Sequence, residues 1–164
     1  MRKILAIWFS LLLPGALLAD NFVSVFMERC AEDERPLSNV NIGQAMLDKM
    51  AANTDDEELK NTFKELNSIR MINSDNVEDS KYYFKKATEL IKESFYDYDE
   101  AVSVTEMGSK ISVWVKRLGE EKQDLILISL DNGGKLSIIT VSGKIDFDSI
   151  SKLSGSLRDG QQFH

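Results

Sequence analysis

The C-terminal third of the chain constrains the fold most, because residues 101–141 carry the hydrophobic pattern of four consecutive β-strands. In residues 110–117 apolar side chains alternate with serine, tryptophan and lysine, a two-residue period that helical geometry cannot satisfy. Residues 101–105 alternate in the same way, and Gly108 lies between the two segments, where the chain must reverse. The sequence therefore predicts a β-hairpin in this region.

A second hairpin is predicted directly after the first. Residues 125–130 are apolar on both faces of a strand, which is typical of a central strand that is covered on both sides. Residues 135–141 supply its partner, and Asn132 and Gly133 between them tolerate the positive φ angles of a tight turn.

The length of the loop in this second hairpin leaves two registers open. If the loop has two residues, Leu130 lies opposite Lys135. If the loop has three residues, Leu130 faces Leu136. A slip of one residue exchanges the two faces of the sheet, so the sequence does not settle which side chains point inward.

The residues upstream of these strands predict helices that could cover the sheet. The strongest amphipathic pattern begins at Asp79 or Ser80 as N-cap and continues to Phe95. A further strand is expected at residues 68–73, and weaker patterns indicate a short strand within residues 37–42 and a short helix at 44–50. The other expected helices span residues 22–30, 57–66 and 147–157.

The N-terminus has the pattern of a secretory signal peptide over residues 1–19. Arg2 and Lys3 precede an apolar stretch, and Leu17-Leu18-Ala19 is an acceptable cleavage sequence. We therefore expect the protein to be exported, periplasmic or secreted, with a retained membrane anchor as the alternative. The rest of the chain divides into an N-terminal helix and linker (20–36), a single domain (37–157) and a frayed C-terminal tail (158–164).

Charge excludes two classes of partner. Cleavage after residue 19 leaves 18 basic and 27 acidic residues, a net charge of −9. Nucleic acids and anionic lipids are polyanions that basic patches must neutralise, so neither is an expected partner. No stable membrane span is expected after cleavage, because the apolar stretch of the signal peptide is removed. Cys30 is the only cysteine and is expected to be a small apolar side chain on a helix face, with a thiol for intermolecular pairing as the alternative.

The C-terminal half resembles a known family. A helix of sequence YYFKKATELI, two alternating strands that end in ISVWVKR, the segment DLILIS and the segment KLSIITVSGKIDFDSISKL occur in that order. This order is similar to the bacterial domain-of-unknown-function family 4252, small exported proteins of the Bacteroidetes type. The most family-like piece is residues 141–146, in which a strand ends in Gly143. The resemblance covers residues 22–157 and implies export and one small domain, with no assigned activity.

Catalytic chemistry has little support in the sequence. The only histidine, His164, is the last residue, which argues against a Ser-His-Asp triad and a multi-histidine zinc site. We therefore expect no catalytic residues, no metal site and no cofactor. The acidic and aromatic residues Tyr96, Asp97, Tyr98 and Asp99 lie at a helix-to-strand junction and are candidates for binding a cation or a basic peptide. A solvated loop with both tyrosines packed on its rim is the alternative.

Trp114 is the second candidate for binding, because it is the only tryptophan that remains after cleavage. It points to the face of its strand opposite Val113 and Val115. Either it belongs to an exposed recognition surface, or a loop, the N-terminal helix or a lysine stem covers it.

Together these patterns predict an α+β domain, an antiparallel sheet of four to five strands with amphipathic helices packed on one face. The favoured function is an exported, non-catalytic binding or assembly module that acts on a protein or envelope component through the face or edge of this sheet. The alternative is a carboxylate-based hydrolase that acts on an envelope glycan or peptide, with Asp97 or Asp99 as the residues to test.

Overall fold

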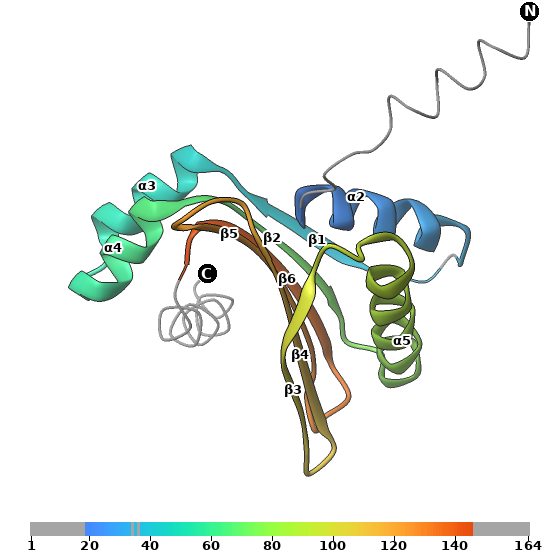
Figure 1. The fold of residues 1–164 in the computed structure, drawn as a ribbon. Helices are drawn as coiled ribbons and strands as arrows, with labels where there is room; N and C mark the ends of the chain where they lie inside the picture. The colour runs from blue at the N-terminus through green and yellow to red at the C-terminus, as the bar shows by residue number, and fades with distance from the viewer. Residues whose placement is uncertain (1–18, 34, 36, 146–164) are drawn as a thin grey trace, which may run out of the picture.

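The protein is built on one antiparallel sheet. The structure, a computed structural model, describes residues 19–145 with the exception of 34 and 36. In the described residues six strands pair in the order β1-β2-β6-β5-β4-β3 (Figure 1). The strands are β1 (Ser38–Ile42), β2 (Leu66–Ser74), β3 (Asp99–Glu106), β4 (Ser109–Arg117), β5 (Lys122–Leu130) and β6 (Leu136–Lys144). The helices are α2 (Ala19–Cys30), the short 3-10 helix η1 (Ala31–Asp33), α3 (Gln44–Asn53), α4 (Glu57–Glu65) and α5 (Val77–Ser94).

The α+β class is confirmed, but the sheet has six strands rather than four to five. The difference comes from β1, which the sequence indicated only weakly. Its five residues pair antiparallel with β2, which in turn pairs with β6. A strand as short as β1 carries too few alternating residues for a clear periodic pattern. Its backbone hydrogen bonds with β2 hold it in the sheet.

The central position predicted for residues 125–130 is confirmed. In β5 every residue from Asp124 to Leu130 is buried, and the strand lies between β4 and β6. The loop that follows has three residues, because Leu130 pairs with Leu136 and the Asp131 N–H donates to the Lys135 carbonyl at 3.0 Å. The second of the two registers left open by the sequence is therefore the observed one.

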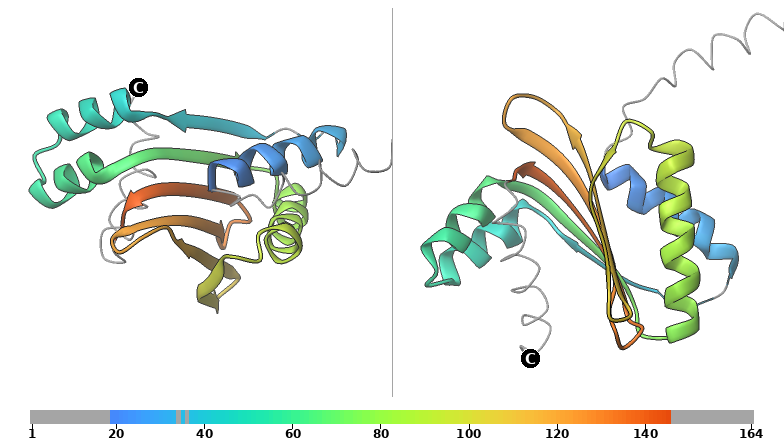
Figure 2. Two further views of the ribbon diagram at one scale, coloured as in Figure 1. Left: turned by 45° about the horizontal axis from the view of Figure 1, so that its top comes forward. Right: turned by 60° about the horizontal axis from the view of Figure 1, so that its bottom comes forward.

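The helices cover both faces of the sheet, and the expectation that they all pack on one face is wrong. Helices α2 and α5 lie on one face, whereas α3 and α4 pack at one end of the opposite face (Figure 2). Helix α4 ends at Glu65 and β2 begins at the next residue. Because no loop separates them, Phe63 of α4 packs with Leu66 and Ile69 on that opposite face.

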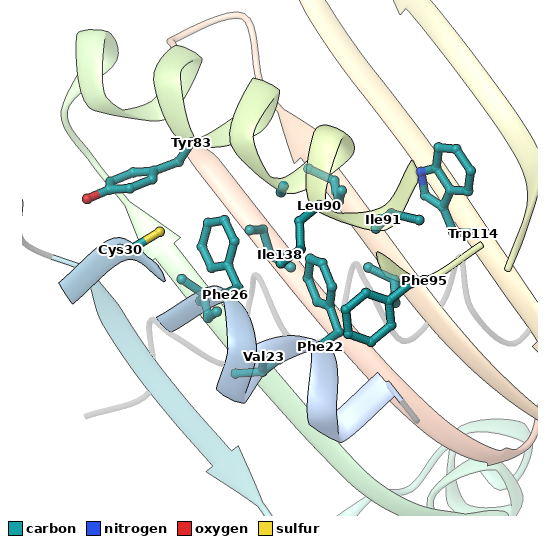
Figure 3. Packing of buried hydrophobic residues seen from close by; sticks show 14 of the residues in the cluster. Phe22, Val23, Phe26, Cys30, Tyr83, Leu90, Ile91, Phe95, Trp114 and Ile138 are labelled. Atoms are coloured by element: carbon teal, nitrogen blue, oxygen red, sulfur yellow. The ribbon is translucent and has the colours of Figure 1, made fainter. Parts of the chain in front are cut away.

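The core between the sheet and helices α2 and α5 combines aromatic and aliphatic side chains (Figure 3). Phe22 of α2 stacks on Phe26 with ring centroids 5.8 Å apart, and it meets Phe95 edge to face at 5.3 Å. Phe26 in turn contacts Tyr83 of α5 at 5.9 Å. The amphipathic stripe predicted for the first helix thus packs against the protein's own sheet.

Helix α5 begins three or four residues earlier than its predicted start. Its N-cap is Asn76, whose side chain accepts a hydrogen bond from the Asp79 N–H at 3.0 Å. Ser80, one of the two predicted caps, is instead fully buried and donates to the Ser74 carbonyl at 3.0 Å. Asparagine is as good a cap as aspartate or serine, so residue preference alone could not choose among neighbouring candidates.

Cys30 is buried at the end of α2, with 3% of its surface exposed, as expected for a small apolar side chain. Burial raises the pKa of its thiol from 9.0 to about 11. The folded protein therefore keeps the thiol protonated at a pH at which the unfolded chain ionises.

This shift predicts a loss of stability at alkaline pH. The folded state holds the proton more tightly, so stability is full below pH 9 and falls as the pH rises toward 11. A shift of this size corresponds to a decrease of about 2 kcal/mol in the free energy of unfolding by pH 11. Urea denaturation between pH 8 and 11 measures it, and Cys30→Ala should remove this part of the decrease. Equal pH dependence in both proteins would contradict the prediction.

Three predicted segments lie outside the described residues: the signal peptide up to residue 18, the helix at 147–157 and the tail at 158–164. Within the described part of the chain, no helix combines the length and the apolar character that crossing a membrane requires.

Candidate functional site

The acidic and aromatic residues singled out in the sequence lie where α5 leads into β3. The chain turns after α5, and the Tyr98 N–H donates to the Phe95 carbonyl at 3.0 Å. This turn separates the two tyrosines: Tyr96 is 79% exposed, whereas Tyr98 is 3% exposed and belongs to the core. The four candidates therefore do not form one exposed cluster. Tyr96, Asp97 and Asp99 face solvent, and Tyr98 does not.

Asp97 faces a lysine from the neighbouring strand. Its carboxylate lies 3.8 Å from the Nζ of Lys116, whose side chain is only 13% exposed. The same ammonium group lies 5.9 Å from the centre of the Tyr98 ring. Lys116 is thus held between a carboxylate and an aromatic face, an arrangement that stabilises a partly buried cation.

Asp124 of β5 completes a buried polar cluster that the sequence analysis missed. It is 1% exposed, and it accepts hydrogen bonds from the Tyr98 hydroxyl at 3.4 Å and from the Ser142 hydroxyl. Its pairing partner on the adjacent strand β4 is Lys116. A buried carboxylate requires such partners, so the cluster ties β4, β5, β6 and the turn before β3 together. Side chains alternate along a strand, so Asp124 shares one face of β5 with Ile126 and Ile128, and this pattern could have indicated its burial. The predicted strand, however, began one residue later.

Trp114 does not present an exposed surface. It is 6% exposed and lies on the α5 side of the sheet, in the same core cluster as Ile91 and Phe95 (Figure 3). The interpretation in which it is covered agrees with the structure, although the residues beside it, Ile91 and Phe95, come from α5 and its C-cap and not from the N-terminal helix. The interpretation in which it forms an exposed recognition surface does not agree with its burial. Tryptophan buries a large apolar area, which makes it a strong anchor for this part of the core.

A hollow of about 660 Å³ lies at the end of the sheet where β3 begins. Asp97 and Asp99 line it together with the cationic residues Lys116 and Arg117 of β4. Strand β3 pairs with β4 only as far as Val115, so these two cationic residues extend beyond the end of the β3 ladder. The hollow therefore combines both signs of charge beside two β4 residues that pair with β5 but not with β3.

The outer side of β3 is the longest open edge in the described part of the sheet. Strand β3 is last in the strand order and pairs only with β4, and seven of its eight residues are exposed. Figure 2 places β3 at one edge and the shorter β1 at the other. A bulge at Ala101 interrupts the pairing near its start, and residues 102–106 run without irregularity.

Metal chemistry gains no support from the residues that the structure describes. No group of three or more histidine, cysteine, aspartate or glutamate side chains among them could hold a metal ion. The expectation of no cofactor stays a prediction.

Over the residues that the structure describes, the fold and this region define an α+β protein on a six-stranded antiparallel sheet, with a long open edge strand and a mixed-charge hollow at its start. The chain belongs to the family described as a domain of unknown function (DUF4252), whose model matches residues 32–153. The family resemblance seen in the sequence is thereby confirmed. No curated protein and no solved structure matches the chain.

Proposed function

We propose that this protein is a non-catalytic binding or assembly module of the bacterial cell envelope that takes up an extended segment of a partner protein along β3. The observation that carries the proposal is the open edge of β3, with seven of eight residues exposed. A sheet edge presents backbone N–H and C=O groups that an added strand can pair with.

Export is part of the proposal and rests on the pattern of residues 1–19. Cleavage at the expected position would leave Asp20 as the first residue, at the start of α2 (Ala19–Cys30). N-terminal sequencing of the protein recovered from periplasmic and secreted fractions tests this part separately.

The β3–β4 turn identifies which backbone groups face outward. Met107 and Gly108 form a two-residue turn with φ angles of 49° and 85°, and Glu106 pairs with Ser109 across it. In such a turn the closing pair exchanges backbone hydrogen bonds, and hydrogen-bonded and non-hydrogen-bonded pairs then alternate along the ladder. The backbone groups of Ser103 and Thr105 therefore point away from β4, toward an incoming strand.

Proline at either outward position should block strand addition. Ser103→Pro and Thr105→Pro each remove an outward N–H and leave the bonds to β4 in place, which edge strands tolerate. Peptides selected from a displayed library of random decapeptides against the purified protein should lose at least about tenfold in affinity, because at least one backbone hydrogen bond and its neighbours are lost. Fluorescence anisotropy with labelled peptides measures the change.

Alanine at the same positions is the matched control. Ser103→Ala and Thr105→Ala remove the same side chains but keep the N–H, so they should bind the selected peptides as well as the unchanged protein does. Thermal melts establish that all four variants are folded. A library that yields no peptide sensitive to proline but not to alanine would rule out strand addition at β3.

The hydrolase alternative has one observation in its favour, since Asp97 and Asp99 line the same hollow. In this structure the Asp97 carboxylate pairs with Lys116, so Asp97 and Asp99 do not form an isolated pair of carboxylates. Release of soluble fragments from peptidoglycan or casein by the purified protein, compared with Asp97→Asn and Asp99→Asn, decides between the two functions.

A further inference from the structure

We infer that the segment that adds to β3 is basic at both ends and apolar between them. The inference rests on the proposed strand addition and specifies its partner. It follows from which side chains of β3 share one face of the sheet, from the space beside them and from their charge.

Four side chains of β3 lie on the same face in the order acidic, apolar, apolar, acidic. Their partners on β4 are alternate residues, which places them on one face. From one end of the strand to the other they are Asp99, Val102, Val104 and Glu106. Val104 is apolar, yet 43% of its surface is exposed. In a strand paired on both sides, such a side chain would be more deeply buried. An added strand would cover it.

Both acidic ends of this row adjoin open space. Asp99 lines the hollow of about 660 Å³ described above, together with Asp97, Lys116 and Arg117, and Lys116 is paired there with Asp97. Glu106 lines a second hollow of about 270 Å³, which it shares with Val104, Met107 and Ile111. Lysine and arginine side chains are long and have apolar stems, so each hollow has room for one beside the carboxylate.

A second copy of the chain fits this edge poorly. Two β3 strands paired antiparallel over their full length would place Val104 opposite Val102, which is favourable. The same register would place Glu106 opposite Asp99 at both ends, and like charges directly opposite one another destabilise a sheet. A segment with basic residues at those two positions keeps the apolar pairs and replaces both repulsions with attractions.

Two capped peptides test the inference directly. The heptapeptide Lys-Thr-Val-Thr-Val-Thr-Lys places basic residues opposite Asp99 and Glu106, and Glu-Thr-Val-Thr-Val-Thr-Glu is its matched opposite. Placed within identical longer flanks and measured by fluorescence anisotropy, the lysine peptide should bind about tenfold or more tightly than the glutamate peptide at low salt. In the double variant Asp99→Lys/Glu106→Lys the preference should invert. Raising the salt concentration should reduce both preferences.

The outcomes separate this inference from the proposed function. If both peptides bind equally and both lose affinity with Thr105→Pro, strand addition stands and the charge preference is refuted. If neither peptide binds, or if binding is insensitive to Thr105→Pro, the inference fails, and the random library then decides the proposed function independently. Sedimentation that shows a dimer of the unchanged protein, dissociated by Thr105→Pro, would assign the edge to a second copy instead.

Discussion

Replacing Phe22 and Phe26 together by alanine should lower the free energy of unfolding by about 5 kcal/mol or more. Each phenylalanine is fully buried, and a buried Phe→Ala change costs roughly 3–5 kcal/mol through lost burial and the cavity left behind. The two rings stack on each other, so the two effects are coupled and do not simply add. Since domains are stable by about 5–15 kcal/mol in total, a loss of this size removes about a third or more of the free energy of unfolding.

Urea denaturation followed by circular dichroism measures the loss. Glu28→Ala is the matched control, because Glu28 lies on the exposed side of the same helix and its replacement should change stability by less than about 0.5 kcal/mol. If the double variant were as stable as the control, α2 would not belong to the core.

The folded unit begins before residue 32. The family model matches from residue 32, whereas α2 ends at Cys30 and contributes four buried side chains to the core beneath α5. These are Phe22, Val23, Phe26 and Cys30. A chain cut at residue 32 would leave an apolar sheet face and one side of α5 open to water, so binding experiments require α2.

Replacing Gly143 by alanine should lower the free energy of unfolding by about 3 kcal/mol or more. Gly143 lies within β6, one residue before its end, and its φ angle is +140°, a conformation that L-residues rarely adopt. A methyl carbon there would lie 2.5 Å from the Glu65 carbonyl oxygen and 2.9 Å from the Leu66 Cα. Both are backbone atoms at the junction of α4 and β2, so the strain cannot be relieved by a side-chain rotation.

Gly119→Ala provides the control for Gly143→Ala. Beyond the two neighbouring residues, no atom lies within 4 Å of a methyl carbon built at Gly119, so alanine there should leave the melting temperature almost unchanged. Thermal melts of the two variants and the unchanged protein make the comparison. A Gly143→Ala protein that melts with the control would show that the β6–β2 contact can relax.

The close approach at Gly143 also gives a physical reason for the most family-like piece of the sequence. There the register of β2 against β6 shifts between Leu66 and Ser68 as the chain leaves α4. Only a residue without a side chain lets β6 pass this junction.

The local sequence pattern determined much of the secondary structure of this protein. The two-residue period of residues 110–117 and the Asn-Gly turn before residue 135 predicted the C-terminal hairpins, because period and turn chemistry depend only on neighbours in sequence. The helix at residues 22–30 was found in the same way. Local pattern also carried the family resemblance that the family model confirms.

Only the tertiary structure decided which surfaces these elements cover. The stripes of α4 and α5 are both amphipathic, and an apolar stripe does not specify which face of a sheet will bury it. The cover over Trp114 and the partners of Asp124 come from elements far apart in the chain. Strand β3 lies at an edge because β2 pairs with β6, on the side of the sheet away from β3. Strand order is set by non-local pairing, and no property of residues 99–106 taken alone encodes it.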